Sequence, residues 1–191
     1  MKNERTGVDT LEAINDAAVR LIGEKGIEKL TIRDICREVG IATGTFYNYY
    51  KSKNELVLHR LLYMDKHLRE EVLPTLSGSY EEQMIQLMVG YTAHSIRKGV
   101  PYCSEIFQII QTAHITPEQE RQRFFYRCVY DIIAQGQCSG EFNAATDPHE
   151  LTVMTIAFVR GLNVDWCRKD GIYDLRELVA KSMRIWLQGL K

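Results

Sequence analysis

The chain has 191 residues, of which 45% are hydrophobic and 26% charged, and its formal net charge is −1. This composition is typical of a globular protein with one or two domains and a buried core. The sequence contains no apolar run of about eighteen residues, which excludes a membrane-spanning helix, and its start, MKNERTGVDT, lacks the apolar stretch of a signal peptide.

Helix start signals divide the chain into nine predicted helices. Ser52, Ser79 and Thr116 are each followed three residues later by glutamate or glutamine, which is a capping box, and aspartates open two further helices at Asp147 and Asp174. The predicted helices span about residues 9–25, 31–39, 42–50, 52–72, 79–98, 102–113, 116–137, 147–168 and 174–190. Strand-like alternation and Asn-Gly hairpin signals are missing from the sequence, so an all-α fold is predicted.

The segment at residues 31–53 carries the most informative pattern. Thr31 is a hydroxyl N-cap with Asp34 three positions on, and Ile35 lies on the apolar face of a first short helix. Gly40 is placed to end this helix in the left-handed conformation. A second helix of barely two turns follows. Two short helices around a tight turn form the helix-turn-helix arrangement, in which the second helix enters the DNA major groove.

The side chains on the second short helix suit nucleic acid better than a protein core. Phe46 and Tyr50 are four residues apart and are expected to anchor the helix inward. Residues 25–53 hold six basic and three acidic side chains, a modest positive excess in the expected place. Hydroxyls, an amide and an ammonium, which donate to phosphates and bases, gather around this helix at Thr45, Tyr47, Asn48, Tyr49 and Lys53. The alternative is an ordinary helical hairpin with a polar exposed face.

Identities at fixed spacing make the segment specific: Leu30-Thr31-Ile32-Arg33-Asp34-Ile35, then Gly44-Thr45-Phe46-Tyr47-x-Tyr49-Tyr50-x-Ser52-Lys53-x-x-Leu56. In this run the chain resembles the tetracycline-repressor (TetR) family of bacterial transcriptional regulators, closely over about its first sixty residues. The resemblance implies a nine-helix fold, with a helix-turn-helix DNA-binding domain over residues 1–52 and a helical effector-binding and dimerisation domain over 53–191. It also implies a homodimer that binds a palindromic double-stranded DNA operator and releases it when a small-molecule effector binds.

The resemblance assigns DNA contacts to individual positions. Phosphate contacts are implied at Thr45, Tyr47, Tyr49 and Lys53, and contacts to base edges at Arg33, Thr43, Gly44 and Asn48; Thr31 completes the predicted DNA-binding set. Two positions depart from the family pattern. Ala42 stands where a capping serine is common, and Thr43 stands where a lysine is common, so the operator sequence recognised is expected to differ.

The last two predicted helices are apolar over a wide arc, which indicates that they are buried on more than one side. We expect them to form the dimer interface, a four-helix contact with the second copy. The residues assigned to it are Met154, Phe158, Leu162, Val179, Met183 and Trp186. The alternative is that the same side chains form the core of a monomer.

Aromatic and sulfur-containing side chains recur in the middle of the second domain, where apolar walls with few polar groups suit a small-molecule pocket. The predicted effector pocket consists of Met88, Tyr91, His94, Phe107, Phe125, Tyr126 and Trp166. An aromatic set at helical spacing is also typical of plain core.

The sequence contains no nucleophile elbow, phosphate loop, HExxH motif or carboxylate pair at catalytic spacing, so we predict neither an enzyme nor a cofactor or metal site. Five cysteines without a Cys-x-x-Cys pair predict reduced thiols and a cytoplasmic protein. The leading interpretation is a ligand-responsive transcriptional repressor. The alternative interpretation is an architectural or cell-division-linked protein that binds DNA without responding to an effector.

Overall fold

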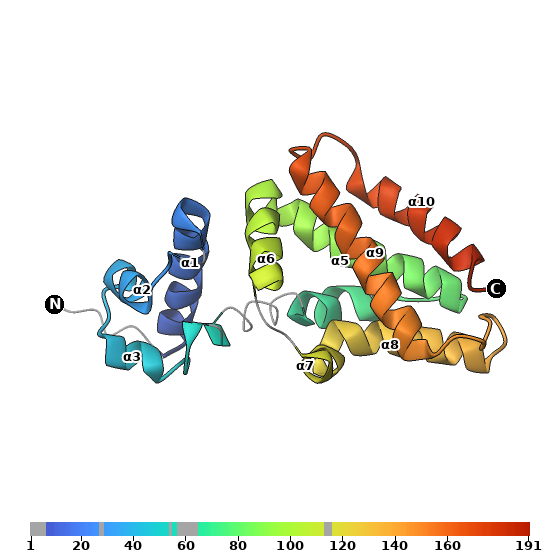
Figure 1. The fold of residues 1–191 in the computed structure, drawn as a ribbon, viewed down its shortest axis with the longest axis horizontal. Helices are drawn as coiled ribbons and strands as arrows, with labels where there is room; N and C mark the ends of the chain where they lie inside the picture. Colours follow the sequence, from blue (N-terminus) through green and yellow to red (C-terminus); the bar gives the residue numbers. More distant parts are fainter. Residues whose placement is uncertain (1–6, 27–28, 54, 57–64, 113–115) are drawn as a thin grey trace. The chain divides into compact units, whose positions relative to one another are not determined.

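The computed structural model describes residues 7–26, 29–53, 55–56, 65–112 and 116–191, and these ranges contain helices and turns but no strand (Figure 1). The all-α prediction is therefore confirmed. The chain divides into two compact units, one of Met1–Leu62 with Ser104–Ala113 and a larger one of Tyr63–Cys103 with His114–Lys191. No helix in the described ranges is long and apolar enough to cross a lipid bilayer.

The amino-terminal unit contains α1 (Gly7–Lys25), α2 (Ile32–Val39) and α3 (Thr43–Tyr47). Helix α1 begins two residues before the predicted cap at position 9. The three helices share a core to which each contributes fully buried side chains, among them Ile14, Ile35 and Phe46. Within it, the Tyr50 hydroxyl donates to the Asn15 Oδ1 at 3.0 Å, so a buried polar bond joins α1 to the segment after α3.

Helix α3 is shorter than predicted. Asn48 is its C-cap, and the Asn48 N–H bonds back to the carbonyls of Thr45 and Phe46 in a tightened last turn. Tyr49 follows in a turn, and the ring of the next residue, Tyr50, packs 5.7 Å from that of Phe46. The expected inward anchoring by Phe46 and Tyr50 is confirmed.

The fourth predicted helix, over 52–72, lies partly outside the described residues, at 54 and 57–64. Its carboxyl-terminal part is not a regular α-helix: residues 65–67 are α-helical, Leu68–Val72 form the π-helix η1, and Leu73–Thr75 form the 3₁₀-helix η2. Pro74 explains the change, because proline lacks an N–H and its ring clashes with the carbonyl four residues earlier. The chain therefore leaves α-helical geometry before Pro74.

The larger unit is built on α5 (Tyr80–Lys98), α8 (Phe124–Cys138), α9 (Pro148–Arg168) and α10 (Leu175–Gln188). Helix α10 packs along α5, and α8 packs against both α9 and α5 (Figure 1). Helix α6 (Val100–Thr112) begins in this unit, whereas its residues from Ser104 onward group with the amino-terminal unit. The predicted caps at Ser79, Thr116, Asp147 and Asp174 all accept backbone N–H bonds at helix starts.

The predicted helix over 116–137 is divided in two. Helix α7 (Pro117–Gln122) ends at Arg123, whose φ of −68° and ψ of 140° are extended, and α8 begins at the next residue. The buried Asp65 carboxylate faces the backbone N–H groups of Phe124 and Phe125 at the start of α8. A carboxylate is favourable at a helix amino terminus, so a contact from another part of the chain supplies the cap that residue 123 lacks.

Candidate nucleic-acid interface

The position of α2 is set by the predicted cap. Thr31 Oγ1 accepts the Asp34 N–H at 3.2 Å, and Asp34 Oδ2 accepts the Thr31 N–H at 3.0 Å, which completes a capping box. The Lys25 ammonium lies 2.6 Å from Asp34 Oδ2. Lys25 first, and then the Thr31 groups, hold the pKa of Asp34 well below its usual range. At the other end, Gly40 has φ 76°, as predicted for a left-handed helix end.

Helix α3 presents its polar side chains outward. Phe46 is fully buried, whereas the adjoining Tyr47 is 52% exposed, and the two rings meet edge to face at 5.7 Å. The rigid anchor therefore fixes the helix while the tyrosine stays accessible. The other predicted contact residues on and around α3 are also accessible: Thr43, Gly44 and Asn48 are exposed, and Thr45 and Tyr49 are half-buried.

Two small residues at the start of α3 are informative. Ala42 is the N-cap and its side chain makes no capping bond, as the departure from the family pattern implies. Gly44 has an ordinary negative φ, and a Cβ there would meet no atom within 4 Å. The fold does not require glycine at this helical position, where glycine is less stable than alanine.

Lys53 has a structural partner that the sequence did not predict. Its ammonium donates to the Leu30 carbonyl at 3.1 Å and the side chain is half-buried. The predicted phosphate contact would therefore come from a side chain that also supports the entry to α2. Near it, Ser52 Oγ accepts the Glu55 N–H at 3.1 Å, but the Glu55 carboxylate bonds to the Lys51 N–H, so only half of the predicted capping box forms.

Helix α2 adds two exposed cations to this surface. Arg33, a predicted contact, is exposed, and Arg37 lies one turn later on the same face with its side chain 80% exposed. Arg37 is a candidate that the sequence reasoning missed, although its spacing of four from Arg33 was a usable signal. Thr31 is exposed, but its hydroxyl and N–H are used within the capping box.

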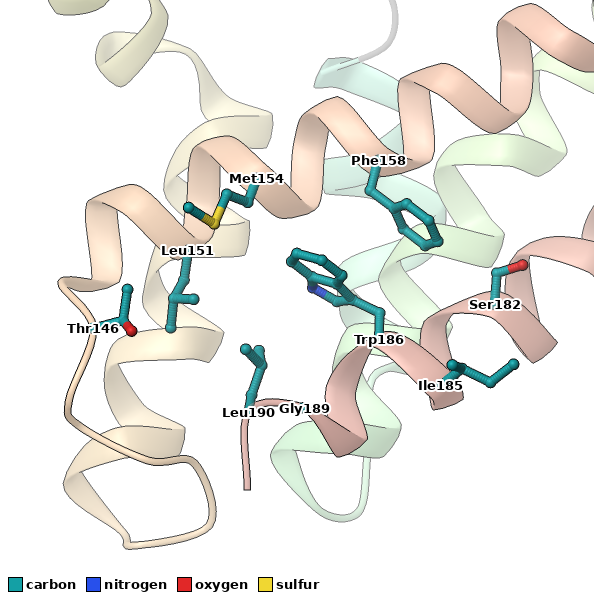
Figure 2. A pocket seen from close by; sticks show the side chains of 9 residues that line it. All are labelled: Thr146, Leu151, Met154, Phe158, Ser182, Ile185, Trp186, Gly189 and Leu190. Atoms are coloured by element: carbon teal, nitrogen blue, oxygen red, sulfur yellow. The ribbon is translucent and has the colours of Figure 1, made fainter.

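In the larger unit, an apolar groove of about 520 Å³ lies between α9 and α10 (Figure 2). Met154 and Phe158 from α9 face Trp186 from α10 across it, and the Phe158 and Trp186 rings stack at 5.4 Å. Met154 is 47% exposed, and Ile185 on the groove is 64% exposed. Three residues assigned to the dimer interface thus lie on one accessible apolar surface.

Two of the assigned interface residues lie elsewhere. Val179 and Met183 are fully buried within their own chain, so they offer no surface to a second copy, and their assignment is corrected. The reason is that α10 packs along α5, which uses the face of α10 that carries them. Leu162 is half-buried on α9.

The predicted effector-pocket residues are buried, but they do not form one cluster. Tyr91 and Phe125 stack at 4.3 Å in the larger unit. The Tyr126 hydroxyl lies 3.1 Å from His149 Nδ1 in the first turn of α9, whereas Trp166 donates to the Tyr173 carbonyl beyond its last turn. These ends of α9 are separated by about 26 Å of helix rise, so Tyr126 and Trp166 cannot both line one compact pocket.

The remaining pocket assignments divide between the two units. Met88 and His94 are buried in the larger unit, and Phe107 is buried on the part of α6 that groups with the amino-terminal unit.

Comparisons with known proteins agree with this geometry. Residues 14–59 match the family model for bacterial regulatory proteins of the tetR family. The uncharacterized HTH-type transcriptional regulator YerO of Bacillus subtilis is 28% identical over 120 residues, which cover 61% of this chain and 40% of YerO. The chain thus spans less than half the length of this relative.

Two solved structures share the whole fold. The fatty acid degradation regulator FadR from Bacillus halodurans superposes with a TM-score of 0.76 at 20% identity, covering 98% of this chain and 99% of that one. FadR from Bacillus subtilis in complex with stearoyl-CoA gives a TM-score of 0.67 at 18% identity, covering 94% of this chain and 99% of that one. Over residues 14–59 the chain therefore matches the tetR family of bacterial regulatory proteins, and its fold is that of these two solved structures.

Proposed function

We propose that the protein is a one-component, ligand-responsive transcriptional repressor that binds a palindromic operator as a homodimer and releases it when a small molecule binds. In this proposal residues 1–52 bind DNA, and residues 53–191 bind the effector and the second copy. The observation that carries the proposal is the accessible hydroxyl and amide surface of α3, held rigidly by the buried Phe46 and Tyr50.

The chemistry of the α3 surface supports contact with duplex DNA. Hydroxyl and amide donors position a helix on phosphates without a large net charge, and exposed Arg33 and Arg37 supply cations beside them. Gly44 allows a backbone to approach closely, and the space around it is empty within the chain. Asn48 carries the amide that can pair with adenine.

The groove between α9 and α10 supports pairing with a second copy. Gly161 lies on the stripe of α9 that carries Met154 and Phe158, is exposed, and a Cβ added to it would meet no atom within 4 Å. A glycine in the middle of a helix costs about 0.5–1 kcal/mol relative to alanine. Close approach of a partner helix would account for it. A dimer would then set two α3 helices about 34–36 Å apart, one helical turn of DNA.

The switch requires an effector with different affinities for the DNA-binding and released arrangements, typically a coupling of about 1–3 kcal/mol. One similar structure is that of a fatty acid degradation regulator, and another, FadR from Bacillus subtilis, contains stearoyl-CoA. Stearoyl-CoA is therefore the first ligand to test for release of DNA.

A gel-shift series on promoter DNA from beside the protein's own gene tests the DNA proposal. Wild-type protein should bind a palindromic fragment, with affinity falling as salt rises. Tyr47→Phe should weaken binding to all sequences alike, whereas Asn48→Ala should lose about 1–3 kcal/mol of discrimination at one base pair. Tyr80→Phe, in the larger unit, is the matched control. Absence of binding to any palindromic promoter fragment at moderate salt would refute the proposal.

Chromosome-wide mapping of binding sites separates this repressor from the architectural or cell-division-linked alternative. A local regulator should occupy few sites, close to its own gene. Occupancy spread along the chromosome would favour the alternative.

Light scattering tests the dimer. The wild-type species should have twice the 22.1 kDa chain mass at micromolar concentration. Met154→Glu places a charge in the groove and should shift the protein towards the monomer. Ile172→Glu, at a 79% exposed position outside the groove, should leave the dimer intact. A monomeric wild-type protein would contradict the dimer proposal.

A further inference from the structure

The Arg160 guanidinium lies inside the larger unit, and within the described part of the chain only one of the two N–H groups on its Nε and Nη2 side has a hydrogen-bond partner. Its side chain is 20% exposed, and Nη2 donates to Glu120 Oε1 at 2.8 Å. The Arg160 Nε is buried and has no hydrogen-bond partner in the described ranges. A carboxylate seated on this side of an arginine normally accepts from Nε and Nη2 together. Glu120 takes one of the two bonds.

Further unpaired polar atoms occur on the turns of α5 and α9 that adjoin Arg160. The Tyr91 hydroxyl neighbours Arg160, and Asn163 donates to Thr92 Oγ1 at 3.4 Å, so these turns of the two helices lie together. Asn163 is fully buried and its Oδ1 has no partner; His94, one turn along α5 from Tyr91, is buried with both ring nitrogens unpaired among the described residues. A buried polar group without a hydrogen bond is unfavourable, so a polar guest would be stabilised here.

Glu120 is placed where a ligand could replace it. All other residues of α7, from Pro117 to Gln122, are exposed, and Glu120 alone within that range is half-buried. Its carboxylate contacts Arg160 and, at 3.7 Å, Arg123. Arg123 also has the buried Asp65 as an acidic neighbour. Exchange of the Glu120 carboxylate for a ligand carboxylate would therefore keep the charge on Arg160 balanced.

Apolar side chains lie next to Tyr91 and on the helix turns beside Arg160. Tyr91 stacks on Phe125 at 4.3 Å, with the ring planes 11° apart. Met88 on α5 and Val159 on α9 lie next to the turns that carry Tyr91 and Arg160, and both are fully buried. Apolar side chains close to a cation favour an organic acid with an apolar body over an inorganic anion.

We infer that the effector is a small organic carboxylic acid whose carboxylate binds Arg160 in place of the Glu120 carboxylate. This inference rests on the proposed ligand-responsive function and names its ligand class. Binding of the acid breaks the contact between Glu120 and Arg160, and so releases α7 from α9. That release is the structural change that an acid would couple to the DNA-binding unit.

Titration calorimetry on the full-length protein with two acids, benzoate and octanoate, tests the inference. Their amides, benzamide and octanamide, match them in shape without the charge, and octanoyl-CoA carries the same chain as a thioester. We expect at least one acid to bind and neither amide to do so. Glu120→Gln removes the charged internal competitor and should tighten acid binding by about tenfold, since hydrogen bonds to charged groups are stronger than those between neutral groups. Arg160→Gln should weaken binding at least tenfold.

Glu118→Gln, on the same helix but exposed, is the matched control and should bind as the wild type does. Because Arg160→Gln could disturb the core, the gain in Glu120→Gln is the independent criterion. The inference would be overturned if the amides bound as tightly as the acids, or if octanoyl-CoA alone bound. It would also be overturned if acid binding were unchanged in both Glu120→Gln and Arg160→Gln, or if neither the wild type nor Glu120→Gln bound an acid.

Gel shifts on the same samples separate the two proposals. If the wild type binds promoter DNA while neither the wild type nor Glu120→Gln binds an acid, the acid inference is overturned and DNA-binding regulation stays in place. Protein that binds an acid in the expected pattern but no promoter DNA overturns the proposed function and leaves the acid site.

Discussion

Replacing His94 with glutamine should flatten the dependence of the protein's stability on pH. Burial, followed by the neighbouring His67, Lys98 and Arg97, lowers the pKa of His94 from 6.5 to about 4, and Glu71 opposes this only weakly. The unfolded chain therefore binds a proton near pH 6.5 that the folded chain takes up only near pH 4. Stability is fully present above pH 6.5 and is lost as the pH falls towards 4. From these two values the loss between pH 7 and pH 5 is about 2 kcal/mol.

Urea unfolding at pH 7 and pH 5 measures this effect, with the protein concentration held constant because the stability of the proposed dimer would depend on it. Wild-type protein should lose about 2 kcal/mol more between the two pH values than His94→Gln does. His149→Gln is the control, since the His149 ring lies beside the Tyr126 hydroxyl and between two tyrosine rings in a half-buried site. Equal losses in wild type and His94→Gln would show that the reasoning from burial is wrong.

Three glycine and cap substitutions test other features of the structure. Gly44→Ala should raise the unfolding free energy by about 0.5–1 kcal/mol, because the added Cβ meets open space. The same change should weaken operator binding in a gel shift, and unchanged DNA affinity would remove Gly44 from the interface. Thr31→Ala should cost about 1 kcal/mol in thermal or urea unfolding through loss of the box with Asp34, and a cost near zero would contradict the cap's role. Gly136→Ala places a Cβ 2.3 Å from the Phe142 ring and should cost about 1–3 kcal/mol by calorimetry, whereas a neutral result would mean that the ring moves aside freely.

The helix-turn-helix segment was predictable because its determinants are local. The Thr31 cap with Asp34, the helix end at Gly40 and the inward turn of Phe46 and Tyr50 depend on residues within a few positions of one another. Backbone hydrogen-bond needs at helix ends and the helical repeat decide such features. The family match over residues 14–59 covers the same segment.

The larger unit could be predicted as helices but not as surfaces. Helix α10 is apolar on two sides, and periodicity does not say which side faces α5 and which faces the groove, so Val179 and Met183 were assigned to the wrong one. The pocket prediction failed for a related reason. Tyr126 and Trp166 are both aromatic and buried, but they lie at opposite ends of α9.

The sequence by itself determined the all-α fold, most helix starts and the polar surface of α3, because each of these follows from side chains and backbone groups close together along the chain. Only the tertiary structure decided the break at Arg123, the burial of Val179 and the partnership of Arg160 with Glu120. These depend on groups far apart in the chain, such as the Asp65 carboxylate at the start of α8, and their meeting is set by how the helices pack.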